Sequence, residues 1–387
     1  MLRGDGSVWS SGSSSNGRSE GVEQVIFTGA IAAAAGNYYS IVLMQDGSLW
    51  TTGKQSKGQH SFFDGSTISK RTFSFMQLIP GANAVTAGAF HTIVLTSEGR
   101  VWAAGWNKYG QLGDRTVVDR STFIPVMSDG ATAAAAGDIH SVVVMQDESV
   151  WAAGRNSNGQ LGDGTRTDRS SFVKVLSSGA VDVAAGGYHN MVLMQNGSVF
   201  ASGGNKHGQL GDGSTTDKTS YVQVVSDGAK AVAAGSRHSL VLKEDRSVWA
   251  AGYNMYGQLG NGWTTNRKEF AKVISEEVTI VAAGAFHSMV IKQDGSVWAT
   301  GSNKYGQFCD GTTTSVTFFV KISPFNNGAG HDASHTSYYL HLCPFRYLTT
   351  TMLASVRSSN ITMPPDTEIA AMGEGRLTFL KHILKKN

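Results

Sequence analysis

Short runs of apolar residues, separated by Gly, Asn and Asp, fill most of the chain and return at a fixed interval. The clearest copy of this unit is 232–262, VAAGSRHSLVLKEDRSVWAAGYNMYGQLGNG. No window of the repeats combines helical periodicity with capping residues. Apolar runs this short, joined through DG or NG, are typical of strands connected by tight turns. Each repeat is therefore predicted to form about four antiparallel strands.

A histidine marks the same place in five consecutive copies, and the copies are 49 residues apart. These histidines are His91, His140, His189, His238 and His287, and the aromatic residues that follow them by 11 positions are Trp102, Trp151, Phe200, Trp249 and Trp298. A fixed period of this length indicates a repeat architecture. Four short strands cannot bury both faces alone, so we expect a β-propeller, whose blades cover one another. A linear β-solenoid is the less favoured alternative because its repeats are usually shorter.

The strand that reads G-S-V-W occurs seven times, which predicts an all-β, seven-bladed propeller. The chain opens at Asp5-Gly-Ser-Val-Trp9, within a repeat, so the first blade lacks its first two strands. One more copy would place a histidine near position 336, and His335 lies one residue away. The ring is either closed by segment 330–342 or left with an open seam. We expect a propeller over 1–342, and 343–387 is either a divergent, disordered tail or a gene-model artefact.

Composition limits the function classes. The net charge of +3 is too small and too dispersed to indicate a nucleic-acid surface. No apolar run is long enough to span a membrane, and no leader is visible, although a truncated start would hide one. The two cysteines, Cys309 and Cys343, are too few for a disulfide scaffold. We expect a cytoplasmic or nuclear protein, and secretion stays open if the N-terminus is truncated.

The repeat carries a family resemblance. Its consensus, A-x-G-x-x-H-[ST]-x-x-L followed by D-G-S-V-W-x-x-G-x-N-x-x-G-Q-L-G-D-G, resembles the repeat of the regulator of chromosome condensation family. The copies of G-Q-L-G at 110–113, 159–162, 208–211 and 257–260 match closely, whereas 306–309 reads GQFC. The resemblance covers roughly residues 5–323 and implies a seven-bladed propeller.

The resemblance also implies two kinds of function. Many relatives bind proteins through their repeats, and the founding member is a chromatin-bound guanine-nucleotide exchange factor for the GTPase Ran that uses a protruding β-hairpin. Consecutive repeats of 49 residues leave no room for such a hairpin. We therefore favour a monomeric, non-enzymatic scaffold that binds a protein partner, without cofactor or metal. Exchange activity on a Ran-like small GTPase is the alternative, and an enzyme or lectin is the third class.

The repeated histidines and tryptophans are interpreted as structural. A catalytic group acts once in one pocket, whereas these residues recur in every blade. Each histidine is expected to start its strand and to hydrogen-bond a neighbouring strand or loop. Each tryptophan is expected to pack between blades, with its indole N–H bonded.

Three weaker motifs point to other chemistry. Segment 17–21 matches the G-x-S-x-G of hydrolases but lacks the strand–turn–helix context. His331, His335, His341 and Cys343 lie close enough in sequence to bind zinc, but their spacing matches no established pattern. The Asp-Gly positions Asp163, Asp212 and Asp310 recur singly in the repeats, so turn chemistry explains them better than calcium binding.

The most variable positions fall in two connections of each repeat. In an up-and-down blade the first and third connections lie on the same side. The variable residues there are aromatic and basic, as binding hot spots are, and loops on a rigid scaffold often carry function. The predicted partner-binding residues are Phe90, Trp106, Tyr109, Ile139, Arg155, Tyr188, Lys206, Arg237, Tyr253, Tyr256, Phe286, Lys304 and Tyr305.

Overall fold

The computed structural model describes residues 2–3, 6–13, 19–26, 28–37, 39–53, 70–322 and 339–340. The chain divides into units 1–356 and 357–387, and the second unit lies wholly outside the described residues. The predicted tail 343–387 also lies outside them. The described part contains no helix long and apolar enough to cross a membrane.

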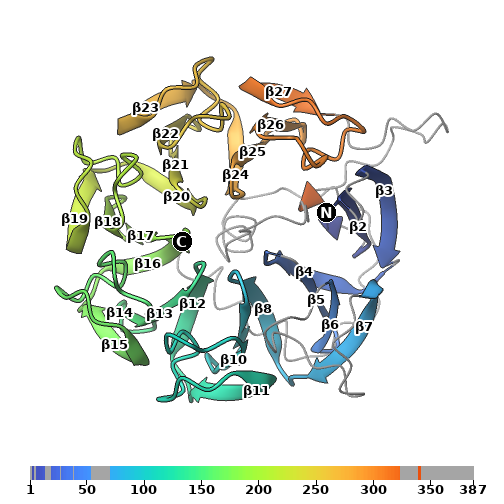
Figure 1. The fold of residues 1–387 in the computed structure, drawn as a ribbon, viewed down its shortest axis with the longest axis vertical. Coiled ribbons are helices and arrows are strands. Elements are labelled where there is room, and N and C mark those ends of the chain that lie inside the picture. Colours follow the sequence, from blue (N-terminus) through green and yellow to red (C-terminus); the bar gives the residue numbers. More distant parts are fainter. Residues whose placement is uncertain are drawn as a thin grey trace, which may run out of the picture. The chain divides into compact units, whose positions relative to one another are not determined.

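Six blades each contain four consecutive antiparallel strands, arranged around a common centre (Figure 1). The innermost strands are β4 (Ala30–Ala35), β8 (Ala82–Ala87), β12 (Ala131–Ala136), β16 (Ala180–Ala185), β20 (Ala229–Ala234) and β24 (Val278–Ala283). The second strands are β5 (Tyr39–Met44), β9 (His91–Thr96), β13 (His140–Met145), β17 (His189–Met194), β21 (His238–Lys243) and β25 (His287–Lys292). The third strands are β6 (Ser48–Gly53), β10 (Val101–Gly105), β14 (Val150–Gly154), β18 (Val199–Gly203), β22 (Val248–Gly252) and β26 (Val297–Gly301). The outer strands are β7 (Lys70–Leu78), β11 (Arg120–Met127), β15 (Arg169–Leu176), β19 (Lys218–Val225), β23 (Arg267–Ile274) and β27 (Val316–Ile322).

A further four-stranded sheet joins the two ends of the propeller. Its order is β28 (Tyr339–Leu340), β1 (Leu2–Arg3), β2 (Val8–Ser13) and β3 (Ser19–Ile26). In β1, Leu2 pairs with Leu340 on one side and with Val8 on the other. The propeller prediction is confirmed, and the seventh sheet includes the two-residue strands β1 and β28. The expectation that the first blade lacks its first two strands is wrong, because residues 2–3 form the second strand, and only the first strand, β28, comes from segment 330–342.

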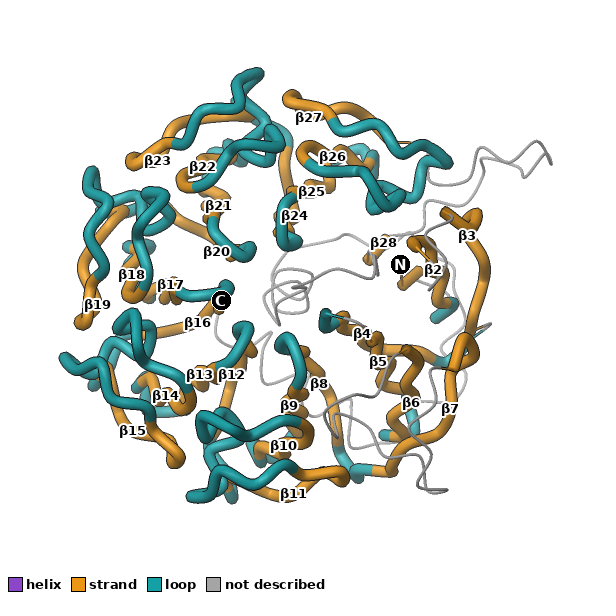
Figure 2. Tube along the Cα trace, viewed as in Figure 1, coloured by secondary structure: helices purple, strands orange, loops and turns teal. Residues whose placement is uncertain are grey.

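Small residues dominate the inner strands because neighbouring blades approach closely there. A Cβ added to Gly88 would lie 2.4 Å from the carbonyl oxygen of Gly137 in the next blade, which is closer than van der Waals contact allows. The backbone N–H of Ala89 donates to the carbonyl of Asp138 at 3.1 Å, and similar bonds link other neighbouring blades. The tube drawing shows the loops at the inner strands gathered around the centre of the propeller (Figure 2).

The hydrophobic core lies largely between adjacent blades. One cluster packs Met191 and Leu210 of blade β16–β19 against Val232 and Val241 of blade β20–β23. All four side chains are fully buried. Each blade therefore depends on its neighbours for burial, as the repeat pattern predicts.

Candidate functional site

The five repeated histidines begin the second strands, and His91, His140, His189 and His238 each contact the next blade through the imidazole. In each, the imidazole Nε2 lies against the residue that follows the next histidine. The pairs are His91–Ser141 at 2.9 Å, His140–Asn190 at 2.6 Å, His189–Ser239 at 2.8 Å and His238–Ser288 at 2.9 Å. We call these the histidine contacts. In each pair the two residues are 50 positions apart in sequence and belong to adjacent blades.

A second hydrogen bond fixes the proton in each histidine contact. The Ser141 hydroxyl donates to the carbonyl of Gln111 at 2.7 Å, and the Asn190 amide donates to the carbonyl of Gln160 at 2.6 Å. The serine hydroxyl has only one proton, so its oxygen must accept from the histidine. The same follows for the Asn190 Oδ1 atom, so these histidines carry their proton on Nε2. Their Nδ1 atoms are buried acceptors without a hydrogen-bond partner.

These histidines are neutral at physiological pH. Burial lowers the pKa of His91, His189 and His238 to about 3, and that of His140 to about 4. The hydrogen bond to Asn190 opposes part of this effect at His140. All four side chains are fully buried. Burial would remove water from a charged imidazole at any of these positions, so the four histidine side chains stay in the neutral form.

Tyr39 takes the place of the histidine in blade β4–β7, which the sequence interpretation missed. Its hydroxyl donates to the carbonyl of His91 at 2.6 Å and lies 3.0 Å from the Thr92 hydroxyl. Thr92 stands at the position of Ser141 in the following blade. Tyr39 precedes Trp50 by 11 residues, as His91 precedes Trp102, and this offset is the sequence signal that could have identified the position.

In the five blades from β8 to β27, a buried asparagine organises the third connection. In blade β12–β15, the Asn156 amide donates to Asp163 at 2.9 Å, and its Oδ1 accepts from the Leu161 N–H at 3.0 Å. Burial alone raises the pKa of Asp163, but hydrogen bonds from Thr165 and the Arg169 guanidinium hold it below its usual range. The Asp163 carboxylate thus completes a local network, in keeping with the turn role expected for it.

The G-Q-L-G segment packs this loop onto the next blade. A Cβ at Gly110 would lie 2.3 Å from the Cα of Ser170, and one at Gly113 would lie 2.3 Å from the Phe172 ring. Both glycines also have positive φ angles, of 77° and 73°. Glycine is therefore favoured at both positions, although Cys309 occupies the second one in the last repeat with a φ angle of 55°.

The tryptophans are half-buried. Trp102, Trp249 and Trp298 pack against clusters between blades. The indole N–H of Trp151 donates to Ser149 at 2.9 Å, and Trp249 and Trp298 bond the equivalent serines. The Trp102 N–H has no hydrogen-bond partner, because Arg100 occupies the serine position.

In the five blades from β8 to β27, the first and third connections are hydrogen-bonded to one another. The N–H of Trp106 donates to the carbonyl of Phe90 at 2.8 Å, and that of Tyr253 donates to Arg237 at 2.8 Å. Equivalent bonds occur in the other three of these five blades. We call the side of the propeller formed by these connections the loop face.

One group of predicted residues lies on blades β8–β11 and β12–β15. The Trp106 ring packs edge-on against Phe90 at 5.7 Å and against Tyr109 at 5.4 Å. The Arg155 guanidinium lies 5.1 Å from the centre of the Tyr109 ring. We call these four residues the Trp106 cluster, and all four are half-buried.

A second group crosses three blades. The Arg237 guanidinium lies 6.0 Å from the Tyr188 ring centre and 3.5 Å from His207 Nε2. The His207 ring lies 4.9 Å from that of Tyr253, which in turn contacts Tyr256 and Phe286 at 6.2 and 6.1 Å. The members of this Tyr253 cluster are Tyr188, His207, Arg237, Tyr253, Tyr256 and Phe286. Burial, followed by Arg237 and Lys206, lowers the pKa of His207.

The remaining predicted residues differ in exposure. Lys206, Lys304 and Tyr305 are exposed, and the Lys304 ammonium lies 5.5 Å from the Tyr305 ring. Ile139 is only 8% exposed, so it offers little surface to a partner.

The two most exposed aromatic side chains among the described residues are absent from the predicted partner-binding set. Trp263 and Phe318 are 68% and 62% exposed. Trp263 stands where sister loops have Thr165 or Ser214, and Phe318 stands where an outer strand has Ser220. Both are departures from the repeat, which is the signal that could have found them.

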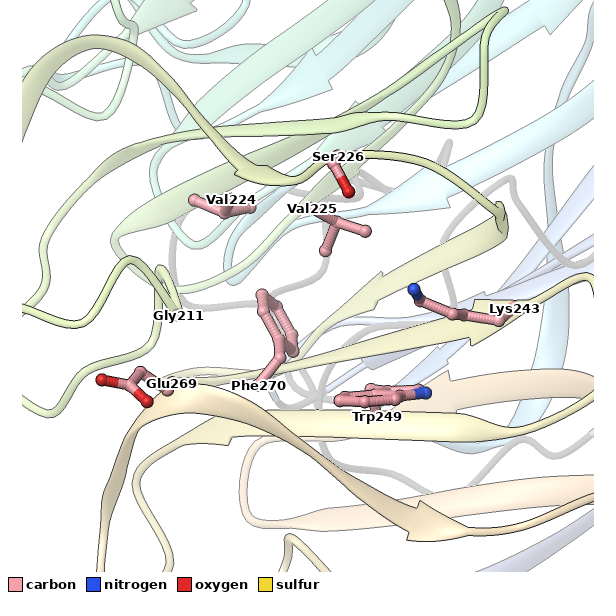
Figure 3. A pocket seen from close by; sticks show the side chains of 8 residues that line it. All are labelled: Gly211, Val224, Val225, Ser226, Lys243, Trp249, Glu269 and Phe270. Atoms are coloured by element: carbon pink, nitrogen blue, oxygen red, sulfur yellow. The ribbon is translucent and has the colours of Figure 1, made fainter.

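A shallow pocket of about 300 Å³ lies between the outer parts of blades β16–β19 and β20–β23 (Figure 3). Its walls include Val224, Phe270 and Trp249, with Lys243 and Glu269 at separate places along the rim. The Lys243 ammonium lies 5.2 Å from the Trp249 ring centre. This pocket is mainly part of the packing between blades.

The other candidate motifs are not brought into a described site. His331, His335, His341 and Cys343 lie outside the described residues, as do residues 17–18 of segment 17–21, whereas residues 19–21 belong to strand β3. Within the described ranges, no three His, Cys, Asp or Glu side chains gather in a way that could hold a metal ion.

Comparisons with known proteins agree with this architecture. The RCC1-like domain profile matches residues 1–277, and the regulator of chromosome condensation (RCC1) repeat profile matches 278–307. The solved structure of human WBSCR16 is similar at 20% identity and a TM-score of 0.70, covering 79% of this chain and 84% of that one. Yeast RCC1 (Prp20), solved bound to Kap60, gives 18% identity, a TM-score of 0.66 and coverage of 75% and 74%. A Saccharomyces cerevisiae Prp20p structure, described with its binding to Gsp1p and histones, gives 19%, 0.67, 75% and 76%. A comparison with curated protein sequences found no match.

Proposed function

Because the chain belongs to the RCC1-like domain family, we propose that it is a non-enzymatic interaction propeller that binds a protein partner through its loop face. The Tyr253 cluster carries this proposal. It links first and third connections of three blades through aromatic and cationic contacts. Tyr188, His207, Arg237 and Tyr253 differ from the residues at the same places in the other 49-residue repeats, whereas the histidine contacts repeat. The other two members recur, Phe286 as Phe90 and Tyr256 as Tyr109 and Tyr305.

The physical character of the cluster suits protein binding. Tyr and Arg are enriched among residues that dominate interface energies, and aromatic rings lose little conformational entropy on binding. Neighbouring rings already hold Tyr253 and Phe286 in place, 6.1 Å apart. A surface organised before binding needs less ordering when a partner arrives.

Photo-crosslinking tests which side of the propeller meets the partner. A photoreactive phenylalanine analogue replaces Tyr256, which is 43% exposed on the loop face. The matched control carries it at Val181, which is 44% exposed near the fourth connection, on the other side. The proposal expects a discrete cross-linked protein at position 256 and none at 181. The same product from both positions, or from 181 alone, would contradict it.

Guanine-nucleotide exchange is the second candidate. The similarity to Prp20p, whose structure is described with its binding to Gsp1p, favours this function. The uniform spacing of strands from β12 to β26 provides no protruding hairpin in those blades. The test is release of labelled GDP from a panel of Ran-like GTPases. Acceleration of about a hundredfold on one GTPase would establish exchange, and none on any would reject it for that panel.

A further inference from the structure

The loop between β22 and β23 departs from its sister loops at several positions. Asn261 stands where three sisters have Asp114, Asp163 and Asp212, and Asn266 stands where they have Asp119, Asp168 and Asp217. Trp263 replaces a threonine or serine, and Met255 replaces a lysine or serine. The loop has thus lost two carboxylates and gained two large apolar side chains.

The sister loops show what the first carboxylate does. Asp114 forms an ion pair with Arg120, and Asp163 forms one with Arg169, each at 2.7 Å. Each arginine is the first residue of the outer strand of its blade. Asp212 pairs with Lys218 at 3.2 Å in the same way. The cation at this register is therefore neutralised by its own loop in three blades.

Blade β20–β23 keeps the cation and lacks the carboxylate. Asn261 Oδ1 accepts from the Asn254 amide and from the Trp263 N–H, both at 3.1 Å, as the Oδ1 atom of Asp163 accepts in its loop. The Asn261 Nδ2 atom consequently takes the place of the oxygen that accepts from arginine. Nδ2 is buried and has no hydrogen-bond partner. A donor there cannot pair with Arg267.

Arg267 is exposed and forms no ion pair with any residue that the structure describes. Glu269, the acidic residue in the same strand, extends over Gly213 of the preceding blade. Its Oε1 atom would lie 3.4 Å from a Cβ added to Gly213. The next residue, Lys268, is a second exposed cation. The local charge is therefore positive.

Apolar surface adjoins this cation. Met255, Trp263 and Phe318 are 61%, 68% and 62% exposed. Phe318 belongs to the outer strand of the following blade, and its Cζ would lie 2.2 Å from a Cβ on Gly262, directly before Trp263. Exposed apolar groups collected in this way mark interaction sites, and tryptophan is enriched in hot spots.

We propose that Met255, Asn261, Trp263, Arg267 and Phe318, here called the Arg267 patch, bind a protein segment that carries a carboxylate beside apolar side chains. The carboxylate of the segment pairs with Arg267, as the loop's own aspartate does in three sister blades. The apolar side chains cover Trp263 and Phe318. Charge-assisted arginine–carboxylate bonds are strong and directional, which suits this role. The patch shares no residue with the Tyr253 cluster, which it adjoins where the Tyr253 hydroxyl lies 3.2 Å from the Met255 sulfur. It goes beyond the loop-face proposal in naming the chemistry of the bound segment.

The chain offers a matched variant for the test. Asn261→Asp restores the sister carboxylate, so it should neutralise Arg267 from within the loop and raise the melting temperature. The probe is a fluorescein-labelled peptide, Ser-Glu-Phe-Leu-Glu-Gly-Ser, titrated by fluorescence anisotropy. One control peptide carries Gln in place of both Glu residues, and another carries Ser in place of Phe and Leu.

The proposal expects wild-type protein to bind the first peptide, with affinity reduced at least tenfold by N261D or by either control peptide. Trp263→Thr should weaken binding while leaving the fold intact, because threonine stands at that place in sister loops. Unchanged affinity for N261D, equal binding of the Gln peptide, or no wild-type binding up to millimolar protein would each overturn the proposal. Sedimentation should show a monomer, and a dimer that W263T dissociates would instead assign the patch to a second copy of the chain. Arg237→Ala changes the Tyr253 cluster and no residue of the Arg267 patch, so it should leave peptide binding unchanged. Failure of this proposal is therefore distinguishable from failure of the loop-face proposal.

Discussion

The imidazole Nε2 of His140 lies 2.6 Å from the Oδ1 of Asn190, although the two residues are 50 positions apart. Asn190 also donates to the Gln160 carbonyl, so one side chain joins two parts of the preceding blade. Serine performs both roles in the sister contacts His91–Ser141 and His189–Ser239. The contact between blades therefore requires a side chain that both accepts and donates.

Removing that side chain should destabilise the propeller. Asn190→Ala leaves the buried His140 N–H without an acceptor, so we expect a loss of about 1–3 kcal/mol in the free energy of unfolding. Asn190→Ser is the matched control and should remain within about 1 kcal/mol of wild type. Urea denaturation followed by tryptophan fluorescence measures both. Equal losses in the two variants would contradict the hydrogen-bonding role.

Acid should destabilise the protein through its buried histidines. Burial lowers the pKa of His91, His189 and His238 to about 3, well below the unfolded value of about 6.5. The unfolded chain then binds more protons than the folded chain between these values, so the free energy of unfolding falls as pH falls. Each histidine contributes roughly 1.4 kcal/mol per pH unit below about 6.5.

Denaturation at pH 7, 6 and 5 measures this dependence. His189→Gln removes one titrating group, so its slope should be smaller than that of wild type by about one proton. A free energy of unfolding that stays constant from pH 6.5 to 5 would show that these imidazoles are not held neutral by burial.

Two glycines separate backbone strain from close packing. Gly110 and Gly228 both have positive φ angles, of 77° and 68°. A Cβ at Gly110 would meet the Ser170 backbone, whereas nothing lies within 4 Å of a Cβ at Gly228. Gly228→Ala should cost about 1–2 kcal/mol from the left-handed conformation alone, and Gly110→Ala should cost clearly more. Chemical denaturation compares the two, and similar losses would argue against close packing at Gly110.

Trp102 offers a stabilising change. Its N–H has no hydrogen-bond partner because Arg100 stands where other blades have serine. Arg100→Ser should supply an acceptor and raise the free energy of unfolding by about 1 kcal/mol relative to Arg100→Ala. Both variants lose the exposed Arg100–Glu98 ion pair, so that contribution cancels. Equal stability of the two variants would show that the new hydroxyl does not bond the indole.

Much of the fold follows from the period and from local turn chemistry. Repetition of His140 and Trp151 at 49 residues predicts the blades, and alternation of connections predicts that Phe90 and Trp106 share a face. The role of Tyr39 could not be read in the same way, because a phenol reaches the next blade through different atoms from an imidazole. The pairing of Leu2 with Leu340 depends on closure of the ring, and the repeat pattern is weak at both ends.

The candidate site was predictable only in part. Sequence variability located the loops of Arg237 and Tyr253, and their side chains do form one connected cluster. It did not separate the buried Ile139 from exposed residues, because both occur at variable positions. Trp263 and Asn261 become informative only when each is compared with the sister loop whose aspartate pairs with arginine.

The most direct test of the loop-face proposal is partner affinity across the Tyr253 cluster. The partner identified by cross-linking is titrated against wild type, the double variant Arg237→Ala with Tyr253→Ala, and the control Val181→Ser on the other side. The account predicts at least tenfold weaker binding for the double variant, with a melting temperature close to that of wild type, and unchanged binding for the control. Full affinity in the double variant would contradict the account, and so would a loss of affinity explained by a large fall in its melting temperature.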